Sequence, residues 1–280
     1  MTRTPLAVIS ISGPALGGPS TPEQEREVAR VCAAVAALVQ RGWRAVLTHG
    51  LGPRAGVLAH RPAPSAAEEK HAPAAKVTAA TQGAMGFLFQ KAFAGEFRRS
   101  GLARQAVAVI TQVLVERADP SILENGVHAP LPQQVLELPL ISDLVEKDRV
   151  VICCGGGGIP VAWNVDRELE GIEAILDQDR SSALLARSLA ADAFVLCGEQ
   201  RAVLVRPGTP EEKRLGLVPA SEARALLQRG EFGAGGAGPK VQAALDYLAG
   251  NANAGARAVI GGFDDLAGLI EGTAGTRLVP

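Results

Sequence analysis

The sequence Arg149-Val150-Val151-Ile152-Cys153-Cys154-Gly155-Gly156-Gly157-Gly158-Ile159-Pro160 is the strongest single indication of the fold. Residues 149–154 predict a buried strand, because the apolar residues run without the alternation of a half-exposed strand. The strand leads directly into four glycines, which permit positive φ and let backbone N–H groups approach an oxyanion without a Cβ in the way. Taken alone, the run is typical of either an anion-binding turn or a tight structural turn.

Strand and helix patterns alternate on both sides of this run. Further strands are predicted at 6–11, 44–48, 105–111, 193–196 and 257–260, and helices at 21–41, 76–99, 133–146, 180–190, 221–228, 239–249 and 264–271. Such alternation favours a mostly parallel sheet with helices on both faces. We therefore expect one α/β domain over 1–280, a three-layer α/β/α sandwich with an N-lobe at about 1–160 and a C-lobe at about 161–280. Residues 62–73 predict a surface loop.

Composition excludes several classes of protein. Hydrophobic residues make up 47% of the 280 residues, and 28 basic residues balance 29 acidic ones without a basic stripe that would favour nucleic acid. No apolar run approaches the roughly 20 residues of a membrane span, and the stretch after Met1 is short for a signal peptide. The four cysteines form no CxxC pair, so we expect no metal site, no disulfide framework and a cytoplasmic protein with buried thiols.

Two further glycine turns follow predicted strands. They are Ser12-Gly13-Pro14 and His49-Gly50-Leu51-Gly52-Pro53. Because parallel sheets bind ligands at the carboxyl ends of their strands, we expect the three turns to converge on one crevice. His49 is predicted either to hydrogen-bond within its turn or to act as an acid or base.

Charged residues stand near two predicted helix starts. Asp177-Gln178-Asp179 precedes one helix, where acids either cap the helix or position a cation. Lys240 follows Gly238-Pro239 at the start of another helix. A cation is disfavoured at a helix N-terminus unless an anion lies beside it, so Lys240 is either functional or part of the solvated surface.

Read together, these segments resemble carbamate kinase, a member of the amino acid kinase superfamily. The run 155–161 matches the family's Gly-Gly-Gly-Gly-Ile-Pro-Val throughout. Residues 48–54 are similar to Thr-His-Gly-Asn-Gly-Pro-Gln, and 171–179 to Gly-Val-Glu-Ala-Val-Ile-Asp-Lys-Asp. Shorter similarities follow in the family's order at 12–16, 81–83, 111–112, 182–186, 235–240 and 275–278.

The resemblance implies a homodimer that transfers phosphate between carbamoyl phosphate and ADP. Carbamate or carbamoyl phosphate, a small anionic ligand, would lie over the N-lobe turns, and Mg-ATP or Mg-ADP over the C-lobe. The implied catalytic residues are Lys240, Gln178 and Asp179. The implied anion-binding residues are Gly13, His49, Gly50, Gly52, Pro53, Gly155, Gly156, Gly157 and Gly158, and the implied nucleotide-binding residues are Asp177, Gly198, Gly238 and Lys240.

Several positions depart from the family pattern. The family lysine of Asp-Lys-Asp is Gln178, a neutral amide that brings no positive charge to phosphoryl transfer. The family asparagines of the first two turns are Pro14 and Leu51, and a family aspartate is replaced by Gly198. The long excursion with a Lys-Pro-Ile-Gly-Pro motif is missing, so the lid subdomain is predicted to be reduced or absent.

Two hypotheses about function follow. The departures favour a carbamate-kinase-like protein that keeps an anion crevice but has reduced or lost phosphotransferase activity, a pseudokinase with a binding or regulatory role. The alternative is an active carbamate-kinase-type phosphotransferase, or a kinase of a related small acid, in which Arg54 or Arg180 replaces the missing lysine.

Overall fold

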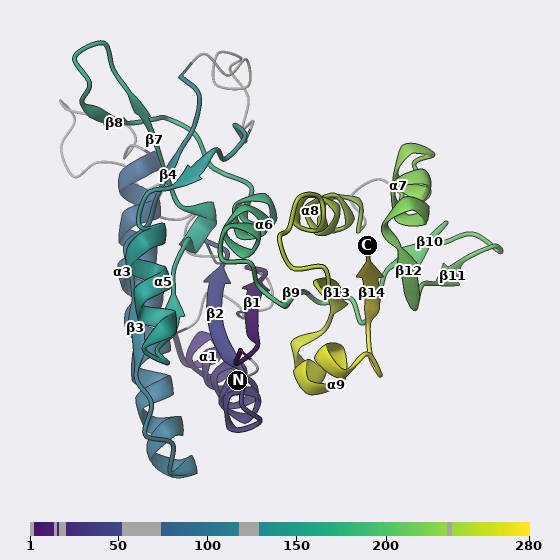
Figure 1. Cartoon of the computed structure of the whole chain (residues 1–280), viewed down its shortest axis with the longest axis horizontal. Coiled ribbons are helices and arrows are strands. Elements are labelled where there is room, and N and C mark those ends of the chain that lie inside the picture. The colour runs from purple at the N-terminus through teal and green to yellow at the C-terminus, as the bar shows by residue number, and fades with distance from the viewer. Residues whose placement is uncertain (1–2, 14–15, 17–20, 52–73, 118–128, 234–236) are drawn as a thin grey trace.

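An eight-stranded sheet runs through the molecule, in the order β12-β14-β13-β9-β1-β2-β6-β3 (Figure 1). The computed structural model describes residues 3–280 except 14–15, 17–20, 52–73, 118–128 and 234–236, so the predicted loop at 62–73 lies outside the described residues. The strands of this sheet are β1 (Leu6–Ile11), β2 (Arg44–His49), β3 (Ala106–Ala108), β6 (Val150–Ile152), β9 (Ala193–Cys197), β12 (Leu217–Pro219), β13 (Arg257–Gly261) and β14 (Thr276–Val279).

Strand direction in this sheet is mostly parallel. β1 pairs in parallel with β2 and β9, and the parallel pairing continues to β6 and β3 on one side and to β13 on the other. β14 runs antiparallel to β13, and β12 follows β14 in parallel. The predicted α/β class is confirmed, and six strands end at the same edge of the sheet.

Helices cover both faces of the sheet. On one face lie α1 (Thr21–Gln40), α3 (Ala74–Ser100) and α9 (Leu266–Glu271); on the other lie α5 (Leu138–Glu146), α6 (Gln178–Ser188), α7 (Ala220–Gln228) and α8 (Gly238–Leu248). β1 is buried on both sides, because alternate side chains of a strand point to opposite faces. Leu6 and Val8 join the apolar cluster beneath the α5–α8 group, whereas Ala7 and Ile9 join the cluster beneath α1 and α3.

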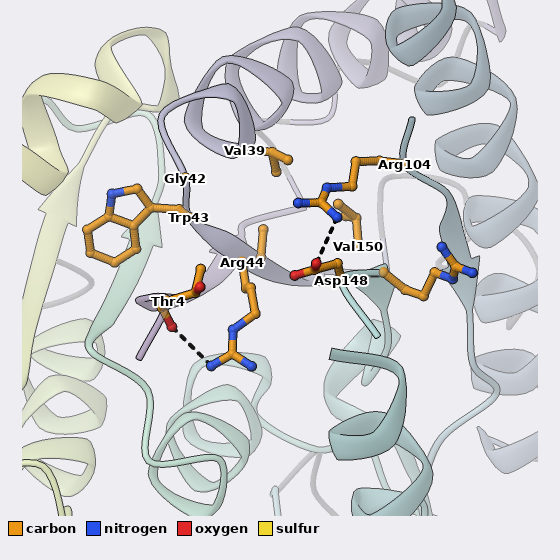
Figure 2. Close-up of a pocket in the computed structure, with 10 residues that line it drawn as sticks. Thr4, Val39, Gly42, Trp43, Arg44, Arg104, Asp148 and Val150 are labelled. Carbon is orange, nitrogen blue, oxygen red and sulfur yellow. Dashed lines mark hydrogen bonds and ion pairs between the residues drawn. The ribbon is translucent and has the colours of Figure 1, made fainter. Parts of the chain in front are cut away.

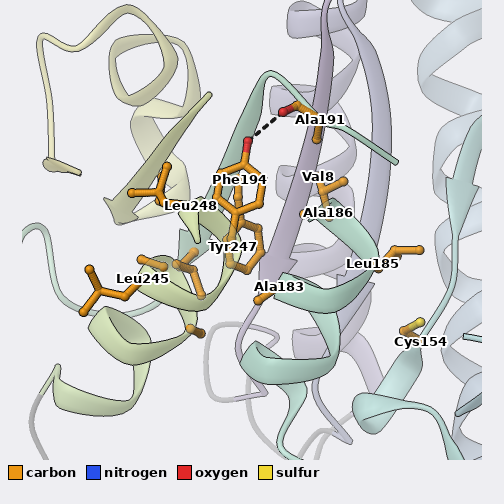
Figure 3. Packing of buried hydrophobic residues seen from close by; sticks show 14 of the residues in the cluster. Val8, Cys154, Ala183, Leu185, Ala186, Ala191, Phe194, Leu245, Tyr247 and Leu248 are labelled. Carbon is orange, nitrogen blue, oxygen red and sulfur yellow. Dashed lines mark hydrogen bonds between the residues drawn. The ribbon is translucent and has the colours of Figure 1, made fainter. Parts of the chain in front are cut away.

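The cluster beneath α6 and α8 is packed around two aromatic rings (Figure 3). Phe194 of β9 and Tyr247 of α8 have ring centroids 5.3 Å apart, and both rings are fully buried. The Tyr247 hydroxyl donates a hydrogen bond to the Ala191 carbonyl at 2.7 Å, so its polar end is satisfied inside the core. The small side chains of Ala183 and Ala186 let α6 lie close to the sheet.

A second, four-stranded sheet stands beyond the carboxyl-end edge of the main sheet (Figure 1). Its order is β5 (Gln134–Val135), β4 (Gln112–Leu114), β7 (Ile159–Trp163) and β8 (Leu169–Gly171). The predicted helix over 133–146 was therefore wrong at its start, because residues 134–135 pair with β4 and the helix begins at Leu138. The predicted strand over 105–111 was also wrong in extent: β3 ends at Ala108 and the chain enters β4 at Gln112.

Two smaller features complete the description. β10 (Leu204–Val205) and β11 (Lys213–Arg214) form a short antiparallel hairpin that the sequence did not predict. Three-residue 3-10 turns stand at Gly155–Gly157 and Phe263–Asp265. Within the described residues, none of the helices is both long and apolar enough to cross a membrane.

Candidate functional site

Three glycine turns meet at the carboxyl ends of β1, β2 and β6, as the sequence predicted. A Cβ built on Gly50 would lie 2.5 Å from the backbone nitrogen of Gly13. A Cβ on Gly155 would lie 2.5 Å from Nε2 of His49. Contacts this close require glycine at both positions, and they bring the three turns together at the carboxyl-end edge, where the crevice was predicted. Gly52, Pro53 and Arg54 lie outside the described residues, as does Pro14.

The four-glycine run forms a turn that only glycine can build. Gly156, Gly157 and Gly158 have φ of 65°, 87° and 93°, in the region that side chains disfavour. A Cβ on Gly157 would lie 2.8 Å from the carbonyl oxygen of Leu176. The N–H groups of Gly157 and Gly158 donate to carbonyls of residues 154 and 155, so two of the four glycine donors are committed to the turn itself.

His49 lies inside the wall of the crevice. Its side chain is buried, its Nδ1 donates to the Gly50 carbonyl at 2.9 Å, and its ring centroid lies 5.7 Å from that of Phe89. Burial lowers the pKa of His49, and the bond to the Gly50 carbonyl opposes this only in part. Of the two predicted roles, the geometry favours the hydrogen-bonding turn residue.

A chain of hydrogen bonds links the first turn to α6 and α8. Nε2 of Gln178 donates to Oγ of Ser10 and to the Ile11 carbonyl, both at 2.9 Å. Oγ of Ser10 donates to Oδ1 of Asp179 at 2.9 Å, and Nζ of Lys240 donates to Oδ2 at 2.7 Å. Asp179 therefore accepts from both sides and holds the ammonium in place.

The two charged helix starts are explained by these contacts. Asp177 caps α6 by accepting from the Arg180 N–H at 2.9 Å, which confirms the capping interpretation for this residue. Asp179 supplies the anion that Lys240 needs at the start of α8, and the two side chains are 14% and 22% exposed. A Cβ on Gly198 would lie 3.4 Å from Cε of Lys240, so the missing family aspartate would stand beside this lysine.

Gly238 is the first residue of α8 and follows the N-cap Ala237, whereas residues 234–236 are outside the described part. Arg180 is half-buried in the first turn of α6, and its predicted role in place of the family lysine stays a prediction. Leu51 covers the glycine turn: a Cβ on Gly156 would lie 2.2 Å from its Cδ2. The crevice wall is apolar at this point.

The residues that tie the turns together were given no site role from the sequence, although 81–83 and 111–112 resemble segments of the family. Gln82 of α3 donates from Nε2 to the carbonyls of Thr111 and Gly155, at 3.1 and 3.0 Å, and its Oε1 accepts from the Thr111 N–H at 2.7 Å. Oγ1 of Thr111 accepts from the Cys154 N–H. Ser10 is fully buried, and as a hydroxyl inside an apolar strand it carried a signal that could have been noticed.

No group of three acidic, histidine or cysteine side chains in the described ranges is placed to hold a metal ion. Among the described residues, this edge offers the Lys240 ammonium, glycine backbone and a carboxylate–hydroxyl network at the carboxyl ends of parallel strands. These are the features of a phosphate- or carboxylate-binding site in an α/β protein.

Comparison with known proteins identifies the family. Residues 5–261 match the model of the amino acid kinase family. The carbamate kinase of Thermococcus kodakarensis is 31% identical over 97% of this chain and 98% of its own length, and that of Pyrococcus furiosus is 31% identical over 92% of both. The structure of carbamate kinase from Giardia lamblia bound to AMP-PNP superposes with a TM-score of 0.92 at 26% identity, covering 100% of this chain and 99% of that one. The chain thus belongs to the amino acid kinase family and, within it, to the carbamate kinases.

Proposed function

We propose that this chain is a phosphotransferase of the carbamate kinase type, which moves a phosphoryl group from carbamoyl phosphate to ADP. The observation that carries the proposal is the Lys240 ammonium, held 2.7 Å from Asp179 where the glycine turns meet. Phosphoryl transfer depends on positioning and on cations that neutralise charge on the transferred group. The names of the relatives support the same reaction, because each is a carbamate kinase over nearly its full length.

In this proposal the two substrates approach the crevice from different elements. The carbamoyl group and its phosphate lie over the turns of Gly13, Gly50 and Gly155, where the turns approach one another most closely. The nucleotide lies at the carboxyl end of β9, beside Gly198 and the start of α8. Support comes from the Giardia lamblia enzyme, a structural neighbour that was solved with AMP-PNP. The phosphoryl group passes from the carbamate oxygen to the terminal phosphate oxygen of ADP, and Lys240 faces both.

Magnesium would enter with the nucleotide. Mg²⁺ in kinase sites is held by one or two carboxylates together with phosphates and water, and it neutralises charge on the phosphate oxygens when bound. Both oxygens of Asp179 already accept, from Ser10 and Lys240, whereas the cap uses Oδ1 of Asp177, so Oδ2 of Asp177 is the carboxylate oxygen that would contribute. The residues fit an ion carried mainly by the nucleotide, because the described part has no cluster of three potential ligands.

The second candidate is a carbamate-kinase-like protein that keeps the anion-binding crevice but has little or no phosphotransferase turnover. It rests on Gln178, whose two amide hydrogens are used on Ser10 and on the Ile11 carbonyl and are not left for a phosphate. The loss of one transition-state donor typically lowers the rate by about 10²–10³-fold. Leu51 adds to this candidate, because it places an apolar group over Gly156.

The deciding experiment measures ATP formation from carbamoyl phosphate and ADP. Turnover above the uncatalysed rate that falls about 100-fold or more in Lys240→Ala supports the first candidate. Lys213→Ala is the control, because Lys213 is an exposed lysine on the short hairpin of β10 and β11. No turnover, together with a melting temperature raised by ADP, supports the second candidate. No turnover and no response to nucleotide or carbamoyl phosphate contradicts both.

We also propose a cytoplasmic homodimer. All four cysteines are free and buried, which agrees with a reducing compartment. β3 is the last strand of the main sheet in the described part, and Phe87 and Ile110 near it are 62% and 49% exposed. An edge strand beside exposed apolar side chains is a surface that a second copy would cover. Light scattering tests this directly, since a monomer has a mass of 28.9 kDa.

A further inference from the structure

A cavity opens at the edge of the main sheet opposite the crevice (Figure 2). It is lined by residues that precede or begin the central strands: Thr4 lies before β1, Arg44 is the first residue of β2, and Arg149 stands before β6. Its volume is about 160 Å³. A single water needs only about 10–15 Å³, and drug-sized ligands need about 300 Å³ or more, so the cavity suits a small molecule.

The lining carries an excess of positive charge. Three arginines, Arg44, Arg104 and Arg149, and one acid, Asp148, are among the described residues that line the cavity. Nη1 of Arg104 is paired with Oδ2 of Asp148 at 2.8 Å, which leaves two guanidinium charges without a lining acid. Like charges in a concave site raise the local potential for an anion.

Arg44 has hydrogen-bonding capacity that the protein does not use. Its Nη2 donates to the Thr4 carbonyl at 3.0 Å. Its Nε is buried and has no hydrogen-bond partner among the described residues. Nε is closed off from solvent, so a ligand in the cavity would meet the Nη groups of Arg44 and not Nε. A guanidinium fork is shaped to receive two oxygens of one anion.

We propose that this cavity binds a small multivalent oxyanion, with inorganic phosphate as the simplest member of the class. Arg44 and Arg149 supply the charge, and Arg104 is held at the rim by Asp148. The site is separate from the crevice and does not depend on the proposed phosphotransferase activity. Two strands connect the sites all the same, because β2 and β6 begin at the cavity and end at the turns of Gly50 and Gly155.

The test is titration calorimetry of inorganic phosphate into the full chain at constant ionic strength. The crevice is a second place where phosphate would bind, so the titration is made in the Lys240→Ala chain as well as in the wild type. Arg44→Gln and Arg149→Gln are each expected to weaken the Kd about tenfold or more, the loss of one charged hydrogen-bonding partner. Arg224→Gln is the control, because Arg224 is exposed on α7, far along the chain from this edge.

The possible results distinguish binding at the cavity from binding at the crevice and from a general effect of charge. Phosphate binding that survives Lys240→Ala and is weakened by both cavity variants supports the proposal. Binding that is lost in Lys240→Ala but unchanged in Arg44→Gln and Arg149→Gln belongs to the crevice and overturns it. Equal weakening in Arg224→Gln would show a general charge effect and would also overturn it. Circular dichroism melting of each variant shows that the fold is kept; if Arg44→Gln unfolds, Arg149→Gln decides alone.

Discussion

The two edges of the main sheet, each proposed to bind an anion, differ in how they are built. At the carboxyl-end edge the strands finish in glycine turns, and the Lys240 ammonium is paired there with Asp179. At the amino-end edge three arginines and one aspartate line a cavity beside the same strands. One edge relies on backbone shape and the other on side-chain charge.

The two edges also differ in how closely the backbone is packed. Gly157 at the crevice has φ of 87°, and a Cβ there would meet the carbonyl of Leu176 at 2.8 Å. Gly42 at the cavity has φ of 85°, yet a Cβ there would meet nothing within 4 Å. The backbone at the crevice is therefore fixed by its neighbours, whereas the cavity edge tolerates change in shape and depends on its charges.

The largest expected effect comes from adding one methyl group at each edge. Gly157→Ala should lower the free energy of unfolding by about 3 kcal/mol or more, because left-handed backbone costs about 1–2 kcal/mol and an overpacked contact costs about 1–3 kcal/mol. Gly42→Ala has nearly the same φ without the contact, so it should cost only about 1–2 kcal/mol. Urea denaturation of the two variants and the wild type measures the difference. Equal losses in the two variants would show that the crevice turn is no tighter than the cavity edge.

A smaller effect on the free energy of unfolding is expected when the pH is lowered, and it arises from His49 in the crevice wall. His49 is buried, and burial lowers its pKa below the usual value, whereas in the unfolded chain the imidazole binds protons normally. Below the unfolded pKa of about 6.5 the unfolded state therefore binds more protons, and stability falls by up to about 1.4 kcal/mol per pH unit until the folded pKa is reached. Above about pH 7.5 the His49 contribution is constant.

His49→Asn removes the titrating ring and isolates its share of this slope. Urea midpoints at pH 7.5 and 5.5 should fall more in the wild type than in His49→Asn, because the carboxylates titrate in both chains. The same fall in both chains would mean that His49 is protonated without cost, and so that the ring is not held within the wall. The variant is expected to be less stable at both pH values, since the packing against Phe89 is reduced.

The sequence predicted the fold where the pattern was strong. The α/β class was predicted from the apolar run of β1, the amphipathic helices and the glycine run. The mostly parallel direction of the strands followed from the alternation of strands and helices. The pattern failed at residues 134–135, where pairing with β4 replaced a helical start. Local propensity cannot foresee that pairing, because the partner strand lies more than a dozen residues away and its register is set by tertiary contacts.

The glycine turns of the candidate site were predicted, but the hydrogen bonds that link them were not. Gly13, Gly50 and Gly155 come together as expected, since strand ends in a parallel sheet share an edge. Gln82 was noted only within the family similarity at 81–83, and Ser10 was not noted. Neither was given a role, because a polar side chain inside a helix or strand has no local pattern that names its distant partner. The missing family lysine was read from the sequence, but only the structure shows that the Gln178 amide is already used by Ser10 and Ile11.

The smallest expected effect separates charge from shape at the cavity. Asp148 has φ of 58°, a conformation that asparagine adopts about as readily as aspartate, so Asp148→Asn keeps the backbone and removes one negative charge. A unit charge about 4 Å away is worth about 1 kcal/mol in a solvent-exposed setting, which corresponds to about fivefold in affinity. Phosphate should therefore bind about fivefold more tightly to Asp148→Asn than to the wild type, as measured by calorimetry at low salt.

Salt and a distant aspartate supply the controls for this gain. Raising the ionic strength screens exposed charges, so the advantage of Asp148→Asn should shrink as potassium chloride is added. Asp166→Asn, in the exposed turn between β7 and β8, should leave phosphate affinity unchanged. If Asp148→Asn weakens phosphate binding instead, then the Arg104–Asp148 pair holds the guanidinium in its binding position, and the cavity edge depends on shape after all. In that case the two edges would resemble each other, because at each edge an acid would hold a basic side chain in its binding position. Asp179 does this for Lys240.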